Sequence, residues 1–191
     1  IKNTIVGNTV KAEGTGRQGG GGIYCEHYSS PTVTNNTITG NTATAHPSSP
    51  VGGGIYCYDF SSPTIADNEI VGNSAWGSGG EGGGIYCEDY SAPTIANNAI
   101  TGNTTSWGGG GIHCRYSSPW ITGNSITENR ARRGGGVGCD NSSPRIVNNA
   151  IAENRATDGP AGGIYCVKSS PTITGNTITH NSASSNGGGM Y

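Results

Sequence analysis

Residues 82–103 read GGGIYCEDYSAPTIANNAITGN, and close variants of this stretch recur along the whole chain. Each copy carries one cysteine, and successive cysteines are 32, 30, 27, 25 and 27 residues apart. Self-similarity at such a period is typical of solenoids, in which each repeat packs mainly on its neighbours. The sequence therefore predicts a stack of similar coils.

Each unit contains three short apolar runs, such as residues 55–57, 63–65 and 69–71. Each run alternates with period two and is bounded by Gly, Pro, Asn or Ser, a pattern that predicts strands and not helices. The expected fold is all-β, a right-handed parallel β-helix with three short strands per coil and about six full coils. Residues 1–191 are expected to form a single β-helix domain, apparently a fragment of a longer array with partial coils at 1–19 and 187–191.

Aligning the units predicts ladders of identical residues. Alternation in Ile-Tyr-Cys points Ile and Cys into the core and Tyr outward, and two asparagines per unit fit tight corners where their amides can bond the next coil. The expected structural ladders are Cys25, Cys57, Cys87, Cys114, Cys139 and Cys166, and Asn41, Asn73, Asn103, Asn129, Asn154 and Asn181.

The cysteine ladder has three interpretations. A buried free cysteine behaves as a small hydrophobe, which favours a reduced core ladder. Some disulfides remain an alternative, although parallel side chains on adjacent rungs have a poor geometry for a bridge. Metal binding is the least favoured, because no C-x-x-C spacing occurs. The four histidines, His27, His46, His113 and His180, fall in different columns or loops, so neither a metal site nor a catalytic group is predicted.

Composition limits the partners. The net charge is −2, which gives no electrostatic footprint for nucleic acid. No stretch approaches the roughly 20 apolar residues of a transmembrane helix, so no membrane span is expected.

The turn after each cysteine is the candidate ligand site. It carries carboxylates and aromatic rings beside the outward tyrosines, and such groups bind sugar chains or, through oxygen ligands, Ca²⁺. The predicted site residues are Tyr24, Glu26, Tyr56, Asp59, Tyr86, Glu88, Asp89 and Arg115. The alternative is a solvated turn with exposed tyrosines and no ligand. No cofactor other than Ca²⁺ is considered, and no catalytic residue is predicted.

The repeats resemble a known group. Residues 170–178, SPTITGNTI, look like right-handed parallel β-helix repeats, and residues 73–75 followed by 82–86 are similar to repeats of polymorphic outer-membrane-type bacterial surface proteins. The resemblance implies an exported protein, extracellular or at a cell surface. It carries over no catalytic residue, because β-helices of this kind include adhesins, structural proteins and polysaccharide-degrading enzymes.

The function expected from the sequence is therefore a non-enzymatic extracellular solenoid, structural or adhesive. Unpaired strand edges at the ends of a solenoid favour association end to end into filaments. The alternative is a β-helix that binds or degrades carbohydrate, as a lyase, hydrolase or epimerase does, through the lateral tyrosine and carboxylate column; cell-surface glycans are the expected partners in that case. Ice binding is a third interpretation, but the outward Thr-x-Thr pairs it needs are interrupted.

Overall fold

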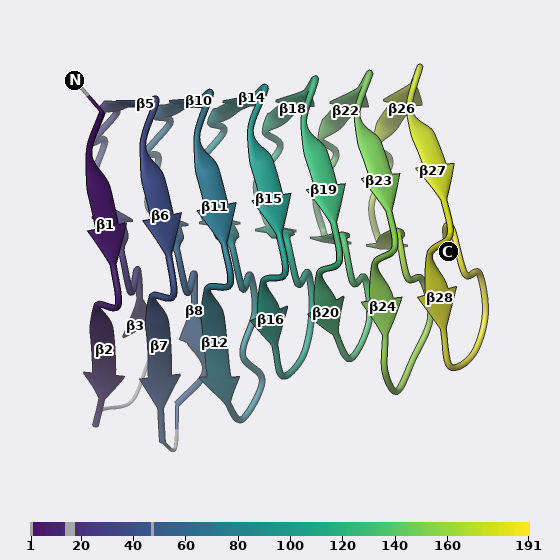
Figure 1. Cartoon of the computed structure of the whole chain (residues 1–191), viewed down its shortest axis with the longest axis horizontal. Coiled ribbons are helices and arrows are strands. Elements are labelled where there is room, and N and C mark those ends of the chain that lie inside the picture. Colours follow the sequence, from purple (N-terminus) through teal and green to yellow (C-terminus); the bar gives the residue numbers. More distant parts are fainter. Residues whose placement is uncertain (1, 14–17, 47) are drawn as a thin grey trace.

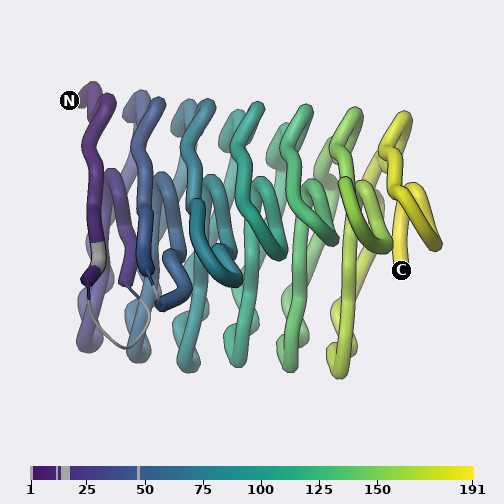
Figure 2. The backbone as a smooth tube through the Cα atoms, turned by 90° about the horizontal axis from the view of Figure 1, so that it is seen from below, coloured from purple at the N-terminus to yellow at the C-terminus, as the bar shows by residue number. Residues whose placement is uncertain are grey.

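The computed structural model describes residues 2–13, 18–46 and 48–191. The chain winds into coils stacked side by side along one axis, with the two termini at opposite ends (Figures 1 and 2). All strand pairing between coils is parallel and in register. The predicted all-β parallel β-helix is confirmed.

Four long sheets run along the stack, and here they are numbered in the order in which a coil visits them. Sheet I comprises β4 (Ile23–Cys25), β9 (Ile55–Cys57), β13 (Ile85–Glu88), β17 (Ile112–Arg115), β21 (Val137–Asp140) and β25 (Ile164–Val167). Sheet II comprises β5 (Thr32–Thr34), β10 (Thr64–Ala66), β14 (Thr94–Ala96), β18 (Trp120–Thr122), β22 (Arg145–Val147) and β26 (Thr172–Thr174).

Sheets III and IV each have seven strands. Sheet III comprises β1 (Thr4–Val6), β6 (Thr37–Thr39), β11 (Glu69–Val71), β15 (Ala99–Thr101), β19 (Ser125–Thr127), β23 (Ala150–Ala152) and β27 (Thr177–Thr179). Sheet IV comprises β2 (Thr9–Ala12), β7 (Thr42–Ala45), β12 (Ser74–Gly77), β16 (Thr104–Thr105), β20 (Arg130–Ala131), β24 (Arg155–Ala156) and β28 (Ser182–Ala183). A small fifth sheet pairs β3 (Gln18–Gly19) with β8 (Pro50–Val51).

Sheet IV corrects the expected number of strands, since complete coils carry four long-sheet strands and not three. The extra strand contains the small residues that follow the second asparagine, such as Ala75, which pairs with Ala43 and Thr105. These small residues are not apolar enough to predict a strand from the sequence. They recur in every unit, however, and pair in register between adjacent coils.

The core is a column of isoleucines and cysteines inside the coils. The rungs Ile55, Ile85 and Ile112 are fully buried, as are Cys57 and Cys87 in the same sheet. All six cysteines are free thiols in the structure.

The asparagine ladders close the corners of each coil. Both the backbone N and the side-chain Nδ2 of Asn73 donate to Oδ1 of Asn103, at 2.9 and 3.0 Å, while Nδ2 of Asn73 also donates to the carbonyl of Ile38. The same pattern links Asn103 to Asn129 and Asn129 to Asn154. The amides therefore hydrogen-bond to adjacent coils on both sides.

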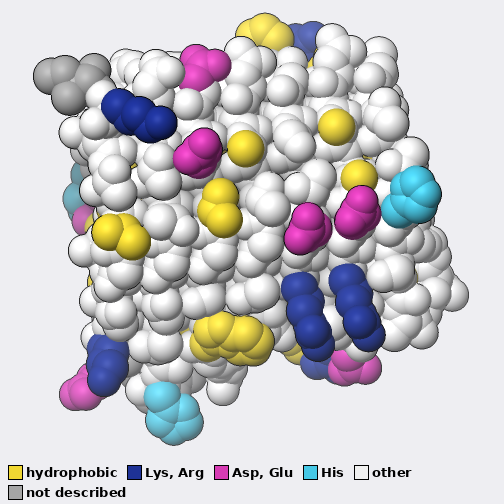
Figure 3. Space-filling view, in the orientation of Figure 1, with side chains coloured by type: hydrophobic (Ala, Val, Ile, Leu, Met, Phe, Trp, Pro, Cys, Tyr) yellow, Lys and Arg dark blue, Asp and Glu magenta, His cyan; other side chains and the backbone are white. Residues whose placement is uncertain are grey.

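The outer face of sheets III and IV is mostly uncharged, and toward the C-terminal end acidic and basic side chains lie side by side (Figure 3). Arg130 and Arg155 are neighbours in register on sheet IV. This face presents no continuous charged stripe. The candidate site lies instead on sheet I.

Candidate functional site

The middle residue of each sheet I strand points away from the core, and these residues form a column that is mostly tyrosine. In the middle of the molecule the column departs from tyrosine. Tyr56 pairs with Tyr86 in register, but the next two rungs are His113 and Gly138 before tyrosine returns at Tyr165. All five rungs are buried. A buried histidine next to a glycine in a tyrosine column requires a local explanation.

The tyrosines are buried because the loop before each sheet I strand folds over them. Val51, Glu81, Gly108 and Arg133 form a line of parallel bridges outside the sheet. Tyr56 and Tyr86 are consequently 1% and 0% exposed. Their rings meet at a tilt of 48°, and Tyr86 stacks on the ring of His113. The expectation that these two tyrosines face solvent as a binding surface is therefore wrong, although they do point away from the core.

The ring of His113 fits a space made by two glycines. It stacks on Tyr86 with ring centroids 5.6 Å apart. A Cβ atom on Gly138 would lie 2.5 Å from Nδ1 of His113, and one on Gly108 would lie 2.9 Å from its Cε1. Since real Cβ contacts are not this short, glycine is required at both places while the imidazole keeps its position.

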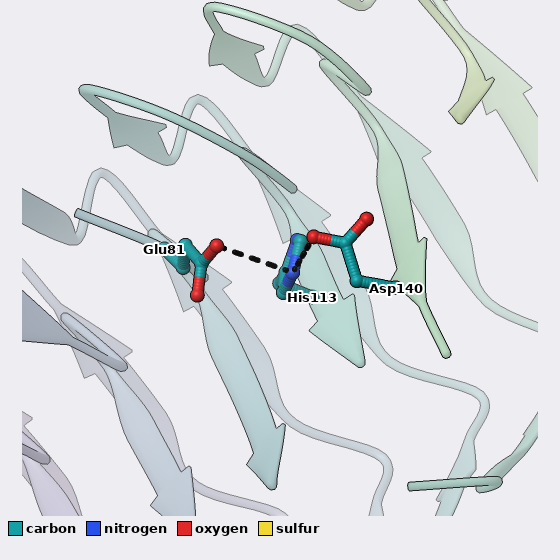
Figure 4. Close-up of side chains that lie close together, drawn as sticks. All are labelled: Glu81, His113 and Asp140. Carbon is teal, nitrogen blue, oxygen red and sulfur yellow. Dashed lines mark ion pairs between the residues drawn. The ribbon is translucent and has the colours of Figure 1, made fainter. Parts of the chain in front are cut away.

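Two buried carboxylates approach the same nitrogen of His113 (Figure 4). Nε2 lies 3.7 Å from Oε1 of Glu81 and 3.5 Å from Oδ2 of Asp140. Glu81 comes from the loop before β13, His113 from β17 and Asp140 from the end of β21, so three successive coils contribute one group each. The hydroxyl of Tyr86 donates to Oε2 of Glu81 at 3.1 Å.

Arginines flank this cluster. Arg115 lies 4.0 Å from Oε2 of Glu81, and Arg133 lies 3.6 Å from Oδ2 of Asp140. The guanidinium of Arg133 also lies over the rings of Trp107 and Tyr165, at 4.7 and 5.0 Å from their centroids. The two positive charges partly compensate the two buried carboxylates.

A pocket of about 350 Å³ opens above the cluster. The charged residues that line it are Glu81, Asp140, Arg115, Arg133 and Lys168, together with polar and aromatic groups such as Asn141 and Trp107. Three cations therefore surround two carboxylates on the wall of one lateral pocket. Polar groups that converge on one cavity can fix the orientation of a ligand.

The predicted site residues divide into two groups. Glu88 is buried and accepts a hydrogen bond from Tyr56 at 2.9 Å, and in the next coil Arg115 pairs with it in register. Arg115 lines the pocket, so the middle of the predicted column does reach the candidate site.

The remaining predicted residues lie elsewhere. Glu26 and Asp59 both contact His27 at the surface near the N-terminal end, and hydrogen bonding to Asp59 raises the pKa of His27. Tyr24, which is 46% exposed, stacks on Tyr56. Asp89 occupies a turn with positive φ.

The sequence contained a signal for the missed residues. Ile-Tyr-Cys becomes Ile-His-Cys at residues 112–114 and Val-Gly-Cys at residues 137–139, two consecutive departures at one rung position. Glu81 could not be placed in this way, because it belongs to a loop of variable length. The structure thus corrects the expectation that no histidine joins a group of possible ligands.

Comparison with known proteins identifies the family. The model of the right-handed β-helix region matches residues 1–106 and 78–191, which together span the chain. The chain belongs to the right-handed β-helix family. No curated protein and no solved structure matches it. Since this fold supports many activities, function has to be argued from the site.

Among the residues that the structure describes, no helix is long and apolar enough to cross a membrane.

Proposed function

We propose that the protein is an extracellular adhesive β-solenoid that binds acidic glycan chains at the lateral pocket without cleaving them. The observation that carries this proposal is the arrangement of Arg115, Arg133 and Lys168 around one pocket on an otherwise weakly charged molecule. Guanidinium groups bind carboxylates through paired N–H donors, so a uronic acid carboxylate is a suitable ligand group.

The aromatic rings of sheet I do not support binding by ring stacking. Tyr28, Phe60 and Tyr90 are exposed in the turns that follow strands of sheet I, but successive rings stack at 5.2 Å, so both faces of Phe60 and one face of each outer ring are covered. The rings of Tyr56 and Tyr86 are buried and in contact, tilted by 48° with centroids 5.4 Å apart, so a sugar cannot reach their faces. Recognition in this proposal therefore depends on charge and hydrogen bonds, and it is expected to weaken as salt screens the cations that line the pocket.

The test is calorimetric titration with oligogalacturonate and with a neutral oligosaccharide of equal length. The wild-type protein is expected to bind the acidic chain more tightly, and Arg115→Gln is expected to weaken that binding. Arg155→Gln is the matched control, because Arg155 is an exposed arginine of sheet IV. Equal affinity for both chains, or equal effects of the two substitutions, would contradict the proposal.

The same samples test the non-enzymatic part of the proposal. After prolonged incubation, the length distribution of the oligogalacturonate should be unchanged, as measured by mass spectrometry. Shorter products that Glu81→Gln abolishes would show instead that the pocket is an active site.

A further inference from the structure

The cluster below the pocket has the composition of a metal site. Glu81, His113 and Asp140 each offer one ligand atom, and these three atoms all lie within 4.8 Å of one another. His113 is fully buried, and neither of its ring nitrogens has a hydrogen-bond partner in the described structure. A buried imidazole without a hydrogen bond carries a desolvation penalty, which a bound ligand at Nε2 would offset.

We propose that Glu81, His113 and Asp140 bind a divalent transition-metal ion, with Zn²⁺ as the ion to test first. This binding requires no glycan, so the site is independent of the proposed function. The ion would be reached from the pocket, whose wall includes both carboxylates.

The distances favour an ion over a simple ion pair. A charged imidazolium donates to a carboxylate at about 2.7–2.9 Å. The separations from Nε2 are instead 3.7 Å to Glu81 and 3.5 Å to Asp140, which are too long for hydrogen bonds. Ligands at about 2.0–2.2 Å around one tetrahedral ion lie about 3.4 Å from each other, close to the two separations from Nε2.

The remaining contacts resemble the outer contacts of metal ligands. Oε1 of Glu81 faces His113, while Oε2 accepts the hydroxyl of Tyr86 and has Arg115 at 4.0 Å. Such outer partners fix the orientation of a ligating carboxylate. Arg133 forms an ion pair with Asp140, 3.6 Å from Oδ2, the oxygen that faces His113.

The three groups are also held rigidly. His113 and Asp140 project from adjacent strands in register, β17 and β21, and Glu81 is bridged to Gly108 of the next coil. The imidazole is fixed by its stack on Tyr86 and by the close backbone at Gly108 and Gly138. Little reorganisation is therefore needed on binding.

The three ligand atoms favour some metal ions over others. One imidazole nitrogen and two carboxylates suit Zn²⁺ and related transition metals, whereas Ca²⁺ takes six to eight oxygen ligands. Three protein ligands leave a further coordination position open, as in zinc sites that take a water or a ligand. The site differs in its residues and chemistry from the Ca²⁺ site expected at the carboxylates Glu26, Asp59, Glu88 and Asp89.

The experiment is titration of the whole, chelator-treated protein with Zn²⁺ and with Ca²⁺ by calorimetry. We expect saturable binding of one Zn²⁺ per chain and no comparable binding of Ca²⁺. His113→Gln should weaken the Zn²⁺ affinity by more than the roughly 10–100-fold that loss of an outer partner causes, and Tyr86→Phe should weaken it by about 10-fold.

His27→Gln is the matched control, because His27 also lies between two carboxylates, Glu26 and Asp59, but at the surface. Its Zn²⁺ affinity should equal that of the wild type. Circular dichroism checks folding, and if His113→Gln does not fold, the isosteric Glu81→Gln replaces it. Absence of saturable Zn²⁺ binding in the wild type, or greater loss in His27→Gln than in the buried-site variant, would overturn the proposal.

Discussion

Removing a buried rung of an asparagine ladder should be among the most destabilising single changes in this fold. Asn103 is fully buried, and its side chain makes four hydrogen bonds. Its Oδ1 accepts from N and Nδ2 of Asn73 at 2.9 and 3.0 Å, and its Nδ2 donates to the carbonyl of Ile70 and to Oδ1 of Asn129 at 2.8 and 3.0 Å. Asn103→Ala removes all four and leaves their partners buried.

The magnitude follows from these contacts. A hydrogen bond contributes about 1 kcal/mol net, so four give about 4 kcal/mol for Asn103→Ala. Asn181 belongs to the same ladder and makes three of the same kinds of bond, two with Asn154 and one with Ile151, but it is partly exposed in the last coil. Water can replace those bonds, so Asn181→Ala should cost about 1 kcal/mol.

Urea unfolding followed by circular dichroism measures the difference. With an m-value of about 2 kcal/mol per molar, the midpoint of Asn103→Ala should fall by about 2 M relative to the wild type. Hydrogen exchange at the backbone amide of Asn73, which bonds to Asn103, reports the loss locally. If the midpoint for Asn103→Ala equals that for Asn181→Ala, the reasoning that buried hydrogen bonds cost more to lose than partly exposed ones is refuted.

Three other changes test separate features. Gly138→Ala places a Cβ atom 2.5 Å from Nδ1 of His113 and should destabilise the protein by about 1–3 kcal/mol in thermal unfolding. Asp59→Asn should lower the pKa of His27 in an NMR titration, because the hydrogen bond to Asp59 raises it. As this folded-state pKa is raised, any stabilisation by the pair is present below about pH 6.5 and is lost as the pH rises through the folded pKa. Ile100→Ala opens a cavity in the buried core and should cost about 2–5 kcal/mol in urea unfolding.

The ladders were predictable because the repeat gives the register directly. In a parallel stack, residues one period apart are neighbours, so Ile55, Ile85 and Ile112 had to pair once the units were aligned. The same argument placed the asparagines at corners. Alternation alone was also sufficient to exclude Tyr86 from the inner core.

The covering loops were not predictable in this way. Alternation indicates on which side of a strand Tyr86 points, but not whether another segment lies over it. The loops before sheet I differ in length, so no alignment of repeats places Glu81 beside His113. The fourth strand was missed for another reason, because its small residues give little apolar signal.

A residue that departs from the repeat indicates a functional site only where the position is buried. On sheet II, Thr94 is followed by Trp120 and Arg145 in register, and both replacements are exposed, so each side chain can extend into solvent without altering its neighbours. Such substitutions change the stability of the protein little and carry little information about function.

The change from Tyr86 to His113 and Gly138 is of the other kind. All three positions are fully covered, so a smaller ring would leave a void unless other groups moved into the space. Here the freed space admits two carboxylates from neighbouring coils, and glycine at 108 and 138 is what allows the imidazole to face them. Glu81, His113 and Asp140 together place ionisable groups in a buried column whose neighbouring rungs are tyrosines. A requirement for stability alone would have been met by another tyrosine, and this is the reason to seek the function of the solenoid at this rung.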